Sequence, residues 1–169
     1  MKLTKNEKQT LKLLLNNPRM PDSEIAPKLD ISSQAVGKIR RKLESSVIES
    51  YSLNLNYSKL GIQTFAVAVA KLTKDGFERR ESEIEQKLLK NPHIINVYRI
   101  SKGNSSYIIL YGFQDLTDLD NFFHSAKIKQ GLHSFIETQE LFAFSHKSLI
   151  KNNPMQLFYK VIDDLGTKA

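Results

Sequence analysis

The chain has 169 residues, enough for one or two small domains, and a formal net charge of +7. Its hydrophobic content of 40%, which includes nine Phe and six Tyr, is sufficient for packed cores and excludes a disordered chain. The sequence contains no Cys, which excludes disulfides and zinc sites built on thiolates.

Three short helices are predicted in the first 44 residues. Thr4 and Glu7 have the spacing of a capping box, which begins the first helix. The second helix is expected to take Asp22 as its N-cap and to tolerate Pro27 near its first turn. The predicted inward-facing residues of these two helices are Leu11, Leu14, Leu15, Ile25, Ala26 and Leu29.

The third helix, in residues 31–44, has two chemically different faces. At about 100° per residue, Val36, Ile39 and Leu43 fall on one side, which we expect to be buried. Ser32 stands where an N-cap belongs. The opposite side is polar and carries Gln34, Gly37, Lys38 and Arg41.

A tight turn at Asp30 and Ile31 joins the second and third helices into a helix-turn-helix pair, whose second helix enters the DNA major groove. In that groove Gln can bind adenine, and Lys or Arg can bind guanine. The residues predicted to contact bases are Ser33, Gln34, Lys38 and Arg41, and those predicted to contact phosphates are Lys28, Ser32, Arg40 and Lys42. The alternative is that the basic residues between 38 and 42 form only a solvated helix face.

Residues 47–56 are predicted to form a small two-stranded wing beside these helices. The first domain is therefore a winged helix-turn-helix DNA-binding domain in residues 1–56, followed by a linker in residues 57–63.

Residues 64–150 are predicted to alternate between strands and helices. The strand FAVAVAKL is followed by a charged helix, and HIINVYRI and SYIILYGF form a hairpin around the polar turn SKGNS. A second helix and the strand HSFIETQELFAF complete the order βαββαβ. This order predicts an α+β, ferredoxin-like domain with four strands in one sheet and both helices on one of its faces.

The other face of this sheet needs a cover, because the strand at residues 107–113 is apolar on both sides. A second copy of the sheet is the economical cover, so we expect a homodimer or a higher homo-oligomer. The predicted interface residues are Phe65, Val67, Tyr107, Ile109 and Tyr111. The alternative cover is the C-terminal helical tail in residues 151–169, which has apolar residues at helical spacing.

The basic charge favours polyanionic partners but does not separate nucleic acid from an anionic membrane. The N-terminal sequence MKLTKNEKQT has no apolar stretch after its charges, and the apolar run at Phe65 is too short to span a bilayer. We therefore expect a cytoplasmic protein with no membrane partner.

Residues 3–150 resemble the Lrp/AsnC family of archaeal and bacterial transcription regulators, also called feast/famine regulatory proteins. The match is carried by SEIAPKLDISSQAVGKIRRKLESSVIESY, by LNYSKLG and by the βαββαβ order. The resemblance implies a DNA-binding head, an effector-sensing and oligomerising body of the RAM type, and assembly into dimers or rings of dimers. It also implies that Ser32, Ser33, Gln34, Lys38 and Arg41 form the exposed side of the recognition helix.

Two positions depart from the family pattern. Ser46 stands where a Gly is common at the entry to the wing. The turn between the second and third strands, which in amino-acid-responsive members carries acidic residues, lacks a carboxylate. Because a free α-ammonium would have no partner there, we expect another small-molecule effector or none, with Gly103, Asn104 and Ser106 as the candidate effector site.

Two other functions share this fold. An RNA-recognition motif would need aromatic residues where Asn104 and Ser106 stand, so the RNA-binding alternative is disfavoured. A siroheme-decarboxylase-like enzyme would need clustered His, Arg and Tyr; the four His are dispersed, and only His93, Tyr98 and Arg99 fall close together. We therefore expect no enzyme activity, no cofactor and no metal site.

Overall fold

The computed structural model describes residues 2–100, 105–124, 134–151 and 153–167. The chain divides into two compact units, one made of residues 1–54 and 151–169 and the other of residues 55–150. The sequence predicts residues 151–169 as a separate tail, whereas the structure joins them to the N-terminal unit.

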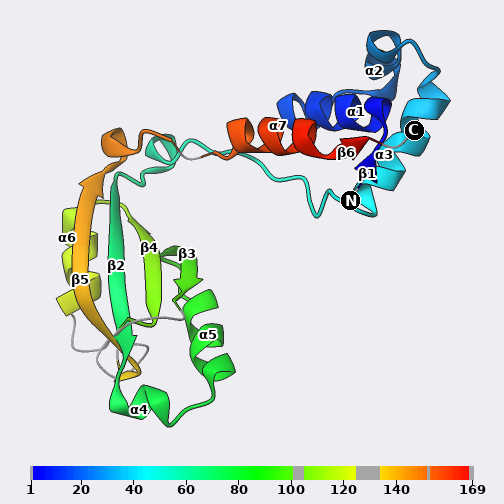
Figure 1. Cartoon of the computed structure of the whole chain (residues 1–169). Coiled ribbons are helices and arrows are strands. Elements are labelled where there is room, and N and C mark those ends of the chain that lie inside the picture. The colour runs from blue at the N-terminus through cyan, green and yellow to red at the C-terminus, as the bar shows by residue number, and fades with distance from the viewer. Residues whose placement is uncertain (1, 101–104, 125–133, 152, 168–169) are drawn as a thin grey trace. The chain divides into compact units, whose positions relative to one another are not determined.

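The described part of the N-terminal unit contains four helices and a two-stranded ladder (Figure 1). Thr4 and Glu7 form the expected capping box: the Thr4 backbone N–H donates to Glu7 Oε2 at 2.8 Å, and Glu7 N–H donates to Thr4 Oγ1 at 3.3 Å. Asp30 takes a left-handed conformation, φ 54°, which makes the turn between the second and third helices. The elements are β1 (Lys2–Leu3), α1 (Lys5–Asn16), α2 (Asp22–Leu29), α3 (Ser33–Glu44), α7 (Met155–Asp164) and β6 (Gly166–Thr167).

Two local expectations for this unit are wrong. Asp22 does not cap α2, because Pro21 occupies the N-cap position without a side-chain bond and Asp22 is the first helical residue. Residues 47–56 contain no strand, so the expected two-stranded wing does not form. This segment exposes Leu53 and Leu55 to solvent, and a hairpin needs an apolar face that it can bury.

The C-terminal segment packs on the helix-turn-helix. Ile162 of α7 is buried in one cluster with Leu3, Leu11 and Leu43. β6 pairs with β1 in parallel, and Asp163 forms an ion pair with Lys12 of α1. The alternative in which this segment covers the sheet is therefore wrong.

The second unit is a four-stranded antiparallel sheet with strand order β3-β4-β2-β5 (Figure 1), which is the expected ferredoxin-like βαββαβ topology. Small Ala66, Ala68 and Ala70 of β2 lie opposite large side chains of β4, and the helices pack over this face. The elements are β2 (Thr64–Leu72), α4 (Lys74–Phe77), α5 (Glu81–Leu89), β3 (Ile94–Arg99), β4 (Tyr107–Phe113), α6 (Leu116–His124) and β5 (Ile136–Ser145).

The structure corrects the expected dimer interface. Tyr107, Ile109 and Tyr111 are at most 2% exposed and form the core with α5 and α6 of the same chain, so they are not available to a partner. Phe65 is also buried, between the rings of Tyr57 and Phe144. Of the five expected residues, only Val67 is on the open face and not buried.

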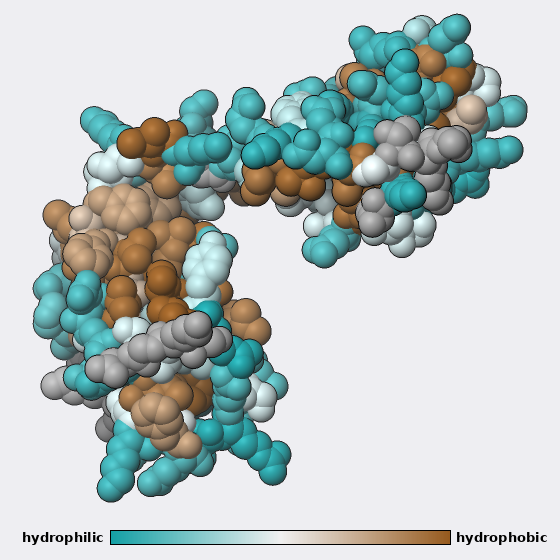
Figure 2. All heavy atoms as spheres, in the orientation of Figure 1, coloured by the Kyte–Doolittle hydropathy of each residue, from teal (hydrophilic) through white to brown (hydrophobic). Residues whose placement is uncertain are grey.

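The face of the sheet opposite the helices is mainly apolar, with Glu140 opposite Val69 and Asn96 opposite Leu110 as its polar positions. Val67 of β2 lies between Leu110 of β4 and Phe142 of β5, and Val69 lies opposite Ile108. Phe142 is 54% exposed. Figure 2 shows apolar side chains gathered over the strands of this unit. We call this surface the open sheet face; it consists of Val67, Val69, Tyr98, Ile108, Leu110 and Phe142.

Candidate nucleic-acid interface

Helix α3 is buried on one side and open on the other. Ser32 caps it, since its hydroxyl accepts from the Ala35 backbone N–H at 3.2 Å, and Val36 and Leu43 are fully buried. The outward side borders an open hollow of about 660 Å³. The hollow is lined by Asp22, Ser33, Gln34, Gly37, Lys38, Arg40 and Arg41.

All four residues predicted to contact bases, Ser33, Gln34, Lys38 and Arg41, line this hollow, and all four are exposed. Arg41 Nε donates to the Gly37 carbonyl at 3.3 Å, which leaves the rest of the guanidinium free to bind. Within the part of the chain that the structure describes, neither Lys38 nor Arg41 forms an ion pair. The helix thus presents two cations and an amide at one surface.

The four residues predicted to contact phosphates fall into two groups. Lys28, in the last turn of α2, and Ser32 are exposed. Arg40 instead donates from Nε to Asp22 Oδ1 at 2.7 Å and from its terminal nitrogen to the Met20 carbonyl, with a side chain only 18% exposed. Burial lowers the pKa of Arg40, but its hydrogen bonds to Asp22 and Tyr51 outweigh this and hold the pKa above its usual value.

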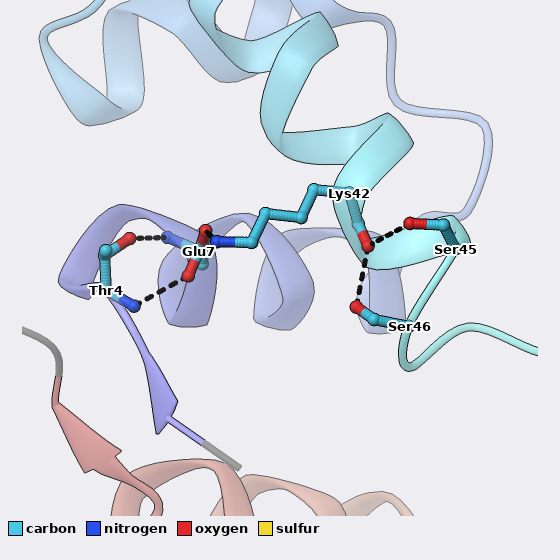
Figure 3. Close-up of polar contacts among 5 residues, drawn as sticks. All are labelled: Thr4, Glu7, Lys42, Ser45 and Ser46. Atoms are coloured by element: carbon cyan, nitrogen blue, oxygen red, sulfur yellow. Dashed lines mark hydrogen bonds and ion pairs between the residues drawn. The ribbon is translucent and has the colours of Figure 1, made fainter.

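Lys42 also has a partner inside the unit, because it reaches from α3 to the carboxylate of Glu7 on α1 (Figure 3). Its carbonyl accepts from the hydroxyls of Ser45 and Ser46, so the Ser46 that departs from the family pattern closes the end of α3. The structure therefore places Arg40 and Lys42 in interhelical ion pairs, and their contact with phosphates stays a prediction.

Asp22 and Glu7 have partners that the sequence does not predict. Both were expected to act at helix N-termini. Glu7 does so, Asp22 does not, and both form ion pairs with α3. The partners lie 18 and 35 residues away, so no local pattern could have identified them.

The candidate effector site is only partly described. Gly103 and Asn104 lie outside the described residues. Ser106 donates from its backbone N–H to the Ala70 carbonyl at 2.8 Å, and its hydroxyl accepts from the Leu72 N–H at 3.2 Å. Ser106 therefore helps to join β4 to β2.

The three residues that could have suggested an enzyme lie in different surroundings. His93 stacks on Phe113, with 4.8 Å between ring centroids. Tyr98 belongs to the open sheet face and is 59% exposed, while Arg99 pairs with Glu81 and Glu85 of α5. Among the described residues, no group of His, Asp and Glu could hold a metal ion, and no helix is long and apolar enough to cross a membrane.

Comparison with known proteins agrees with this architecture. Residues 3–46 match the family described as winged helix-turn-helix DNA-binding. The chain is 27% identical over 133 residues to an uncharacterized HTH-type transcriptional regulator of Pyrococcus furiosus, covering 78% of this chain and 86% of that one. It is 29% identical over 118 residues to the regulator LrpA of Pyrococcus horikoshii, covering 69% and 80%.

Solved structures show the same fold in both units. LrpC of Bacillus subtilis aligns with a TM-score of 0.70 at 20% identity, over 90% of this chain and all of that one. The transcriptional regulator NMB0573 of Neisseria meningitidis, in its complex with L-Met, aligns with a TM-score of 0.71 at 17% identity, over 89% and 94%. The N-terminal residues 3–46 thus match a winged helix-turn-helix DNA-binding family, and most of the chain is similar to HTH-type transcriptional regulators that include LrpA and LrpC.

Proposed function

We propose that this regulator binds specific sequences of double-stranded DNA by placing α3 in the major groove. The main support is that one open hollow, on the solvent-exposed side of α3, is lined by Ser33, Gln34, Lys38 and Arg41. Amide and guanidinium groups on one helix face are suited to base edges. Lys28 and Ser32, which are exposed at the same end of the pair of helices, are suited to phosphates.

The active form that we propose is a homodimer or an assembly of dimers, joined through the open sheet face. Its apolar residues would be buried by a second copy of the same face, and a two-fold pair of heads would match operators with two half-sites. The cytoplasm is the expected location.

A small molecule could modulate this activity through the second unit. The neighbouring regulator NMB0573 was solved with L-Met, but the turn at residues 103–106 has no carboxylate to hold an α-ammonium group. We therefore propose an effector other than a free amino acid, and no catalysis.

Selection of bound DNA from a random pool tests the main proposal. The expected result of the selection is an enriched sequence. The affinity for that sequence should then fall steeply as the salt concentration rises, while the preference over random DNA persists. A sequence-blind response would contradict the proposal and leave only a basic protein that binds polyanions.

A further inference from the structure

Asp22 connects the two helices of the helix-turn-helix pair. Its Oδ1 accepts from Arg40 Nε at 2.7 Å, and the same guanidinium donates to the carbonyl of Met20, two residues before α2 begins. The side chains of Asp22 and Arg40 are 32% and 18% exposed, so water screens this pair only in part. The planar guanidinium thereby holds α3 to the start of α2 at two points.

A second contact, independent of charge, involves Gly37. A Cβ placed on Gly37 would lie 3.1 Å from Asp22 Oδ2, closer than ordinary van der Waals contact. The missing side chain at position 37 thus allows the carboxylate to lie against α3, at the wall of the hollow that Gln34, Lys38 and Arg41 also line.

We propose that Asp22 is a positioning residue for DNA recognition. It acts through Arg40 and against Gly37 to fix α3 relative to α2, and so sets where Gln34, Lys38 and Arg41 meet base edges. This inference rests on the proposed function and goes beyond it, because it assigns a carboxylate of α2 and a half-buried arginine a role in specificity that does not depend on their contacting a base.

A displaced α3 should affect base contacts and phosphate contacts to different degrees. A bidentate contact to a base requires exact placement of a planar group, whereas a contact to a phosphate is largely a point-charge attraction. An α3 that is free to shift should therefore lose specific affinity but keep its non-specific, salt-dependent affinity.

The test uses the full chain and the DNA site selected by the wild-type protein. Asp22→Asn and Arg40→Gln should each reduce the ratio of specific to non-specific affinity about tenfold, with the salt slope unchanged. The double variant should be no worse than Arg40→Gln alone, because both substitutions remove the ion pair between Asp22 and Arg40. Ser23→Ala, the exposed neighbour of Asp22, is the matched control and should leave the ratio unchanged.

Gly37→Ala separates positioning from stability. Ala favours a helix more than Gly does, so folding should be preserved, while the added methyl displaces Asp22 and lowers the specificity ratio. If the methyl acts through Asp22, its effect should shrink in the Asp22→Asn background. An equal effect in both backgrounds would mean that the methyl meets the DNA directly, and would count against the proposal.

Three other outcomes would overturn the role of Asp22. One is an unchanged specificity ratio in Asp22→Asn; another is a salt slope reduced by about one in Arg40→Gln, which would make Arg40 a phosphate contact. The third is loss of secondary structure in both variants at the binding temperature, by circular dichroism. A wild-type chain that selects no sequence would instead overturn the proposed function itself, and this role with it.

Discussion

Glu7 serves two helices at once. It is 4% exposed, accepts from the Thr4 N–H at the start of α1, and accepts from Lys42 of α3 (Figure 3). Burial raises the pKa of Glu7, but the hydrogen bonds from Lys42 and from the Thr4 backbone outweigh it, so the pKa lies below its ordinary value of 4.5. The charged form of Glu7 therefore stabilises the folded unit.

The lowered pKa of Glu7 predicts the effect of Glu7→Gln. Gln keeps the capping box but loses the charge, so unfolding at neutral pH should become easier by about 1 kcal/mol. Because the folded pKa is lowered, the stabilisation by Glu7 is present above the unfolded pKa and is lost as pH falls through the folded pKa. In urea unfolding, the difference between wild type and variant should shrink below pH 4.5. A difference that is constant with pH, or one matched by exposed Glu24→Gln, would contradict it.

Substitutions of Arg41 and Lys28 should change DNA binding in different ways. Arg41→Ala is expected to cost about 1–3 kcal/mol of specific binding and to relax the preference at one base position. Lys28→Ala should weaken all sequences alike and reduce the salt slope by about one. Binding titrations on the selected site and on random DNA, each across salt, measure both effects. Identical behaviour of the two variants would show that Arg41 reads no base.

The role of a side chain can be predicted from the sequence when its partner is only a few positions away. The Ser32 cap and the capping box of Thr4 and Glu7 are confirmed, because both are closed by residues three positions apart. The fates of Arg40 and Lys42 could not be predicted, because their partners come from other helices. Basic residues that are adjacent in sequence therefore divide between pairing and recognition only once α1 and α2 are in place.

Helix α7 was predicted from its amphipathic pattern, but the surface on which it packs was not. Leu157, Val161 and Ile162 predict a helix with an apolar side, but helical spacing does not say which surface that side meets. In the structure Ile162 is 5% exposed, whereas Leu157 is 57% exposed. The burial of Ile162 with Leu3, Leu11 and Leu43 makes the C-terminal segment part of the DNA-binding unit.

Ile162→Ala should therefore destabilise the N-terminal unit by about 2–5 kcal/mol, the range for removing a buried branched side chain. Leu157→Ala on the same helix is the control and should change stability by less than about 0.5 kcal/mol. Native-state amide hydrogen exchange separates the units: protection should fall in α1 and persist in β4. Equal loss in both, or none in α1, would mean that α7 does not support this unit.

The order of helices and strands along the chain predicts the topology of the sheet, but the sequence of each strand does not predict which face of the sheet the helices cover. The βαββαβ order predicts the sheet topology because each connection allows few arrangements. The alternation in β4 predicts two apolar faces, yet it does not say which one the helices cover. The interface was therefore expected on Tyr107, Ile109 and Tyr111. In the structure the helices bury these three side chains instead.

The open sheet face gives the proposed dimer a direct test in Phe142→Glu. Phe142 is 54% exposed in the single chain, so the substitution should leave each fold intact, as circular dichroism would verify. In a two-fold interface the change occurs on both subunits, and burying two carboxylates in an apolar contact is costly. Light scattering at micromolar concentration should show a dimer or larger assembly for wild type and a monomer for the variant. Phe77→Glu, 72% exposed on α4, is the control and should keep the wild-type mass. A wild-type monomer, or a Phe142→Glu chain that assembles as wild type does, would contradict this interface.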